Sequence, residues 1–87
     1  MADNPLFLFL TMTEKFSDHL RATGAYPQKF VLSPSLHDRY LRDVKLVSQS
    51  VGKPIDPGLH MGIRIEIDAA SAGVMVAPDG TEVLLLG

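Results

Sequence analysis

Three histidines, His19, His37 and His60, are the only side chains in this 87-residue chain that titrate near neutral pH. They lie far apart along the chain, and none has the HxxxH spacing that places two imidazoles on one helix face for zinc. The sequence therefore predicts no metal site. We expect the three rings at the borders of apolar helix faces or on the surface.

Residues 33–38, "SPSLHD", combine the serine, histidine and acid that a hydrolase uses. A catalytic triad needs its nucleophile and base within hydrogen-bond reach, whereas neighbours along a helix point in different directions. Ser33 followed by Pro34 also fits a helix start, with Ser33 as the capping residue. We therefore interpret this segment as the beginning of a helix and not as a catalytic site.

Other residues that could carry acid–base or phosphate chemistry lack a supporting pattern. Glu66 and Asp68 share the polar face of a predicted strand, with no apolar pocket beside them to raise a carboxyl pKa. The glycines lie in predicted turns without the spacing of a phosphate-binding loop. The sequence thus predicts a protein that is not an enzyme and needs no cofactor.

Length and composition set the class of protein. Eighty-seven residues predict a single domain, 1–87, because so short a chain cannot divide its apolar surface between two cores. The lack of cysteine fits a reducing compartment, so we expect a cytoplasmic protein. A net charge of −2 argues against nucleic acid as a partner, and the run "LFLFL" is too short for a membrane span.

Capping residues mark the helices, with Ser33 before the second helix and Gly52 after it, and alternating apolar residues mark the strands. The clearest alternation is Ile63, Ile65 and Ile67, which are separated by charged residues. In chain order the expected elements are helix 5–23, strand 29–33, helix 34–50 and strands 63–68, 74–77 and 81–86. This order, α-β-α-β-β-β, predicts an α+β fold with both helices on one face of a small, mostly antiparallel four-stranded sheet. The last three strands are expected to form an antiparallel meander.

The last strand carries apolar residues on both faces. Alternation sends every second residue toward the helices, so Leu84 and Leu86 point the other way. Together with Met75 and Val31, they predict an apolar strip on the face that the helices leave bare. This strand is also expected at the sheet edge, where unpaired backbone groups invite a strand from a partner or a second copy.

The start of the first helix is a second candidate surface. Phe7 and Leu10 project away from the apolar stripe that faces the core. Either the chain's own loops cover these two side chains or they form an interface.

The second helix has charges of both signs, Asp38 and Asp43 among them, opposite its apolar stripe. Such a mixture is typical of a solvated surface. We expect its basic residues, Arg39, Arg42 and Lys45, to form a charged rim that steers a partner.

From residue 30 onward the segments "FVLSPSLHDRYLRDV" and "HMGIRIEIDAASAGVMV" read as a strand, a helix and a returning hairpin. This order resembles the peripheral domain of the tailed-phage capsid fold, over residues 30–87. The axial domain, the extended arm and the long spine helix of that fold have no counterpart here. The resemblance implies a phage or prophage origin, and with it the cytosol of the host cell.

We therefore expect a small, non-enzymatic protein-binding protein of phage or prophage type that docks on a larger host or phage complex. It is similar in size and lack of motifs to small phage-encoded inhibitors, including the anti-CRISPR proteins, which suggests inhibition of a host defence system. The alternative is a structural or assembly protein that forms a homodimer or larger homo-oligomer through the same patches. The interface residues that we predict are Phe7, Leu10, Met75, Leu84 and Leu86, with Arg39, Arg42 and Lys45 at the rim.

Overall fold

The computed structural model describes residues 7–56 and 58–85, which form two helices and a five-stranded sheet. The α+β class is therefore as predicted. The helices are α1 (Phe7–Thr23) and α2 (Pro34–Val51). The strands are β1 (Lys29–Leu32), β2 (Leu59–His60), β3 (Ile63–Ile67), β4 (Val74–Val76) and β5 (Glu82–Leu84).

The ends of α2 lie where the sequence predicts them. The Ser33 hydroxyl accepts a hydrogen bond from the backbone N–H of Leu36 at 3.2 Å, and Pro34 occupies the first turn. At the other end, Gly52 adopts the left-handed conformation, with φ of 68°, and its N–H donates to the Ser48 carbonyl. The two caps hold backbone groups that the helix itself leaves unpaired.

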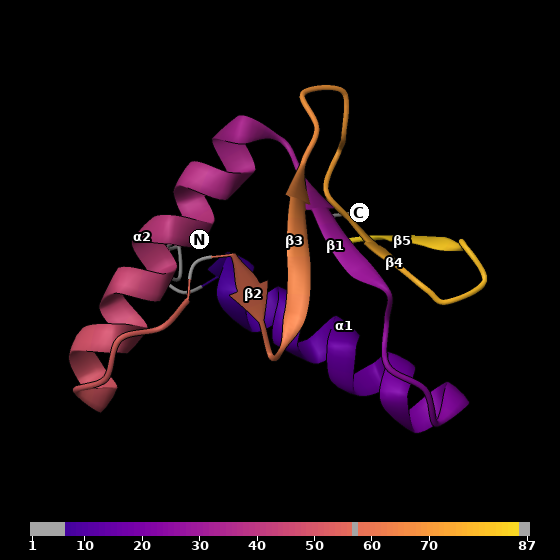
Figure 1. Cartoon of the computed structure of the whole chain (residues 1–87), viewed down its shortest axis with the longest axis horizontal. Helices are drawn as coiled ribbons and strands as arrows, with labels where there is room; N and C mark the ends of the chain where they lie inside the picture. The colour runs from indigo at the N-terminus through magenta and orange to yellow at the C-terminus, as the bar shows by residue number, and fades with distance from the viewer. Residues whose placement is uncertain (1–6, 57, 86–87) are drawn as a thin grey trace.

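The sheet differs from the prediction in its strand order, which is β2-β3-β1-β4-β5 (Figure 1). The expected meander is wrong, because β1 lies between β3 and β4 and pairs with both. β1 and β3 run parallel, as strands joined through a helix commonly do, whereas the other pairs are antiparallel. The fifth strand is β2, two residues of the loop before β3 that pair with Ile63 and Arg64.

Both helices contribute to one core on the same side of the sheet. Figure 1 shows α1 passing behind β3 and β1, with α2 beside the strands. Phe30 and Leu32 of β1 are fully buried against the helices. The buried cluster also contains Leu8, Met12, Phe16, Tyr40, Val44, Met75 and Leu85.

Met75 lies in this core and not on the bare face of the sheet where the sequence analysis put it. Its side chain is 2% exposed, and it pairs in register with Phe30, whose side chain faces the helices. β4 reads Val74-Met75-Val76 and all three residues are buried. A strand so uniformly apolar has no alternation to show which residue faces which side, and this is why the prediction failed.

Asp43 was expected on the solvated face of α2 but is buried. Its Oδ2 atom accepts a hydrogen bond from the backbone N–H of Phe9 at 3.0 Å. Phe9 is in the first turn of α1, where N–H groups have no partner within the helix. Asp43 therefore acts as a capping residue supplied by another helix, and its negative charge lies at the positive end of the α1 dipole.

Candidate functional site

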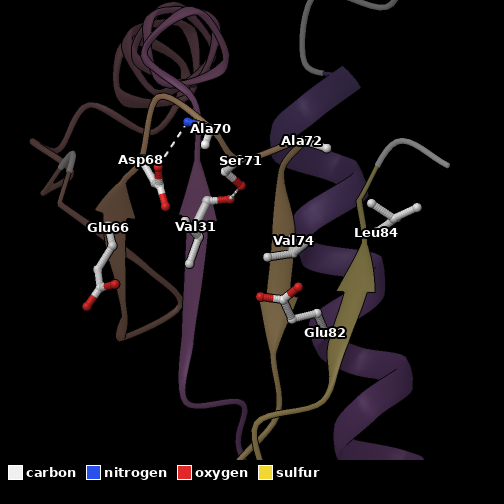
Figure 2. A pocket seen from close by; sticks show the side chains of 9 residues that line it. All are labelled: Val31, Glu66, Asp68, Ala70, Ser71, Ala72, Val74, Glu82 and Leu84. Atoms are coloured by element: carbon white, nitrogen blue, oxygen red, sulfur yellow. Dashed lines mark hydrogen bonds between the residues drawn. The ribbon is translucent and has the colours of Figure 1, made fainter.

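The face of the sheet turned away from the helices carries three apolar side chains from three adjacent strands. Val31 of β1 pairs with Val74 of β4, which in turn pairs with Leu84 of β5. Residues directly opposite each other on neighbouring strands share a face, so the three form a continuous apolar row. Figure 2 shows this row on the side of the strands away from α1. We call this surface, defined by Val31, Val74 and Leu84, the bare face.

The bare face contains a hollow of about 340 Å³ (Figure 2). The apolar row forms its floor. Three carboxylates and the small residues of the loop between β3 and β4 complete its lining. These further lining residues are Glu66, Asp68, Ala70, Ser71, Ala72 and Glu82.

Hydrogen bonds hold the loop between β3 and β4 in place over the sheet. Asp68 Oδ1 accepts from the backbone N–H of Ala70 at 2.9 Å. The Ser71 hydroxyl donates to the Val31 carbonyl at 3.2 Å and accepts from the N–H of Gly73 at 3.0 Å. Because the loop is tied to β1 in this way, the rim of the hollow is formed before any partner binds.

Carboxylates dominate the charge of the hollow. Glu66 has both of its oxygens engaged, one by Lys29 at 2.8 Å and the other by Arg64 at 3.2 Å. The hydrogen bond from Lys29 holds the pKa of the Glu66 carboxyl below its usual value. Within the part of the chain that the structure describes, Asp68 and Glu82 form no ion pair. The hollow therefore combines an apolar floor with two carboxylates whose charge is not offset.

The bare face ends at β5, which is an edge strand, as the sequence predicts. β5 pairs with β4 on one side, and no strand of the described residues lies on its other side. Leu84 is 53% exposed at this edge. An open edge beside an apolar face is the arrangement that binding by strand addition requires.

Of the predicted apolar site residues, the structure places Leu84 on the bare face and Leu10 elsewhere. Leu10 is 41% exposed on α1, on the helix side of the sheet. The side chain of Phe7 and the residue Leu86 lie outside the described part of the chain. The bare face takes Val74 instead, which the sequence analysis did not assign because alternation in β4 is ambiguous.

The predicted basic rim lies on α2 and not around the bare face. Arg42 and Lys45 are exposed, and Arg39 is partly buried and engaged in an interaction. α2 packs into the core from the other side of the sheet. The structure therefore does not bring these basic residues together with Leu84.

Another hollow, of about 250 Å³, lies on the helix side between α1 and the strands β4 and β5. Its charged lining residues have both signs, with Lys15 beside Asp18, so it offers no net preference for a charged partner. His19, Met75 and Val83 complete the lining. Because neither its charge nor an apolar row distinguishes this hollow, we regard the bare face as the candidate site.

His60, expected at the surface, is 1% exposed at the meeting point of α1, α2 and β2. Its Nδ1 atom lies 3.0 Å from the Tyr40 hydroxyl, and its Nε2 atom lies 3.0 Å from the Thr13 hydroxyl. The Tyr40 hydroxyl also donates to the Leu59 carbonyl at 3.1 Å. We call Thr13, Tyr40 and His60 the His60 cluster. Because the Tyr40 hydroxyl gives its proton to Leu59, it can only accept from the ring, which fits the neutral tautomer with the proton on Nδ1.

Burial determines the protonation of this cluster. Desolvation lowers the pKa of His60 to about 4, so the ring is neutral at neutral pH. Desolvation, together with the carboxylates of Asp56 and Asp43, raises the pKa of Tyr40 well above its usual value. The edges of the Phe9 and Phe30 rings lie against the His60 ring, with centroids 4.8 and 5.4 Å away. These features fit a structural core cluster that has no access to a substrate.

The described residues offer no other grouping with evident chemistry. They contain no set of three or more His, Cys, Asp or Glu side chains that could hold a metal ion. Ser33, the serine of the "SPSLHD" segment, uses its hydroxyl as the α2 cap. Neither helix, over its described length, has the combination of length and hydropathy that crossing a bilayer requires.

The site therefore consists of an apolar row, a hollow with uncompensated carboxylates and an open strand edge. No similar protein adds to this description of the site. Comparison with known proteins gives no match to a family model, to a curated protein or to a solved structure.

Proposed function

We propose that this chain is a small, non-enzymatic protein-binding protein that docks on a larger protein complex through its bare face and the β5 edge. The observation that carries the proposal is the apolar row of Val31, Val74 and Leu84, which runs from the buried Val74 and the partly buried Val31 to the exposed Leu84 at an open strand. Apolar side chains grouped in this way on a small domain are typical of a contact site. The open edge adds backbone groups that a partner strand can bind.

The chemistry of the hollow favours a protein over other ligands. Its carboxylates would repel the phosphates of a nucleic acid, and the chain as a whole carries a net charge of −2. A small-molecule site usually has buried polar groups that converge on the ligand. Here the buried polar groups of the described residues, those of Asp43 and of the His60 cluster, are instead satisfied by other groups of the chain.

The finer part of the proposal is a phage or prophage protein that inhibits a host defence system. The resemblance of residues 30–87 supports the phage origin, and the likeness in size and lack of motifs to small phage-encoded inhibitors supports the inhibition. The strand, helix and hairpin on which that resemblance depends correspond to β1, α2 and the strands β3 and β4. β1 lies between β3 and β4, so these two do not form a hairpin with each other.

Self-assembly is the second candidate, favoured by a second open edge. β2 pairs only with Ile63 and Arg64, so the rest of β3 has no strand beside it on that side among the described residues. Two open edges in one sheet would let copies of the chain join. A mass in solution that rises with protein concentration would support this candidate against the first.

The test of the proposed function is a pull-down from bacterial lysate with the wild-type protein and two variants. Leu84→Asp places a charge in the apolar row. Leu46→Asp is the matched control, because Leu46 is also a surface leucine, 41% exposed on α2 away from the bare face. We expect one complex to be retained by the wild type and by Leu46→Asp and lost with Leu84→Asp. Equal retention by all three would contradict a docking role for the bare face.

A further inference from the structure

We infer that the segment bound at the bare face is an extended strand that pairs with β5 and carries a basic and an apolar residue two positions apart. The inference rests on the proposed function and specifies the chemistry of the partner. Three observations support it: the register of β5, the uncompensated carboxylates and the poor fit of a second copy.

The register of β5 sets the spacing of the two residues. Leu84 pairs with Val74, and Glu82 pairs with Val76, so Glu82 and Leu84 both point to the bare face. A strand added at the open edge would place its own side chains directly opposite these two, on the same face. Because side chains alternate along a strand, the two opposing residues of the partner are two positions apart.

The chemical character of Leu84 and Glu82 determines which residue types the partner strand should carry opposite them. Leu84 belongs to the apolar row and favours an apolar neighbour. Glu82 lines the hollow together with Asp68, and neither carboxylate has an ion-pair partner in the described ranges. Among the described residues that line the hollow there is no Lys, Arg or His. A lysine or arginine opposite Glu82 would therefore supply the charge that the hollow lacks.

A second copy of the chain fits this edge poorly. If two β5 strands paired antiparallel about Val83, each Glu82 would lie opposite the Leu84 of the other copy. If they paired about Glu82 itself, two carboxylates would face each other. If they paired about Leu84, the two leucines would face each other, but Glu82 would still have no cationic neighbour, because residues 81–85 include no Lys or Arg. Like charges directly opposite are destabilising, and a carboxylate beside an apolar side chain gains no partner. We therefore assign the edge to a strand of a different protein.

The inference is tested with two short synthetic peptides that differ at one position: one carries a lysine and a valine two positions apart, and the other has glutamate in place of the lysine. Each is titrated into the full chain at low salt while the backbone amide resonances are followed by NMR. We expect the lysine peptide to shift the amides of β5 and to bind at least about tenfold more tightly than the glutamate peptide. Added salt should weaken this preference, because the charges are exposed.

Charge reversal within the chain gives the matched comparison. Glu82→Lys should reverse the preference, so that the glutamate peptide binds more tightly than the lysine peptide. Glu14→Lys makes the same change of charge on the exposed face of α1, away from the hollow, and should leave the preference as in the wild type. Equal binding of the two peptides, or no shift at β5 with either, would overturn the inference.

The inference can fail while the proposed function holds, and the experiments tell the two cases apart. If the peptides do not bind at β5 while the Leu84→Asp pull-down still loses its partner, the docking face stands and the basic strand is wrong. If the amides of β5 shift with protein concentration alone, a second copy covers the edge, and the inference is also overturned. Binding of the lysine peptide with the reversal in Glu82→Lys would support it whatever the pull-down shows.

Discussion

The bare face and the His60 cluster both place polar groups beside apolar side chains, but they lie on opposite sides of the same sheet. In the His60 cluster each ring nitrogen has a hydroxyl partner within 3.0 Å, and the His60 ring is closed off from solvent. On the bare face the apolar row is open at Leu84, and the carboxylates of Asp68 and Glu82 have no cationic partner in the described residues. Polar groups that are satisfied internally stabilise a fold, whereas exposed groups left without partners remain available for binding.

The comparison also shows that residue type alone does not locate function. Histidine is the residue most often used for acid–base chemistry. In this chain the buried histidine, His60, belongs to a core cluster with no access to a substrate. The residues that we assign to binding are valine, leucine and carboxylates, which acquire that role only from their position on an uncovered sheet.

The largest effect on the free energy of unfolding is expected for a substitution in the His60 cluster. His60→Ala should lower the free energy of unfolding by about 3 to 5 kcal/mol, because it leaves a cavity and removes a partner from each of two buried hydroxyls. Urea unfolding followed by circular dichroism measures the change. His37→Ala is the control, since His37 is only partly buried on α2, and should change stability by less than about 1 kcal/mol. Equal losses in the two variants would contradict the role given to the cluster.

The second largest effect expected is a decrease of stability at low pH, caused by the buried His60. The pKa of His60 is about 4 in the folded chain and near 6.5 in the unfolded chain, so the unfolded state takes up the proton first as the pH falls. Stability should therefore decrease between about pH 6.5 and pH 4, by about 3 kcal/mol in total. Unfolding measured across this range in wild type and in His60→Gln tests this. The variant should lose that part of the pH dependence, and a wild-type stability that stays flat over this range would contradict the prediction.

A smaller effect is expected for the cap that α2 provides to α1. Asp43→Ala removes the acceptor from the N–H of Phe9 and should lower stability by about 0.5 to 2 kcal/mol. The thermal midpoint would fall by about 4 to 8 °C per kcal/mol for a domain of this size. Asp43→Asn keeps an oxygen acceptor and should lose less. If the two variants had equal midpoints, the hydrogen bond to Phe9 would not be the source of the effect.

The smallest effect on stability is expected on the bare face. Leu84→Asp should change the free energy of unfolding by no more than about 0.5 kcal/mol, because the side chain is half exposed and leaves no cavity. Urea unfolding of the variant provides this value. A loss comparable to that of His60→Ala would make Leu84 a core residue and would reverse the comparison.

Local patterns predicted the elements of the fold well. Ser33 and Gly52 form the caps expected of them, and the alternating isoleucines form β3. Helix caps and strand alternation depend on residues that are close together in the sequence, so they can be predicted from it. The position of β1 between β3 and β4 depends instead on pairing between distant segments, and nothing in the local pattern specifies it.

The site residues show the same limit. The exposure of Leu84 at an edge strand could be predicted, because alternation and the position near the end of the sheet both indicate it. Met75 could not be placed, since its strand is apolar throughout, and His60 lies in a turn-rich loop without periodicity. Asp43 has the polar character of a surface residue and is buried only because the start of α1 packs against it.

The most direct test of the docking face is amide hydrogen exchange of the chain, free and in the complex recovered by the pull-down. We predict that binding protects the amides of β5 and leaves the exposed face of α2, with Arg42 and Lys45, unchanged. Protection confined to α2 or α1, with β5 exchanging as in the free protein, would contradict the assignment of the bare face as the binding surface.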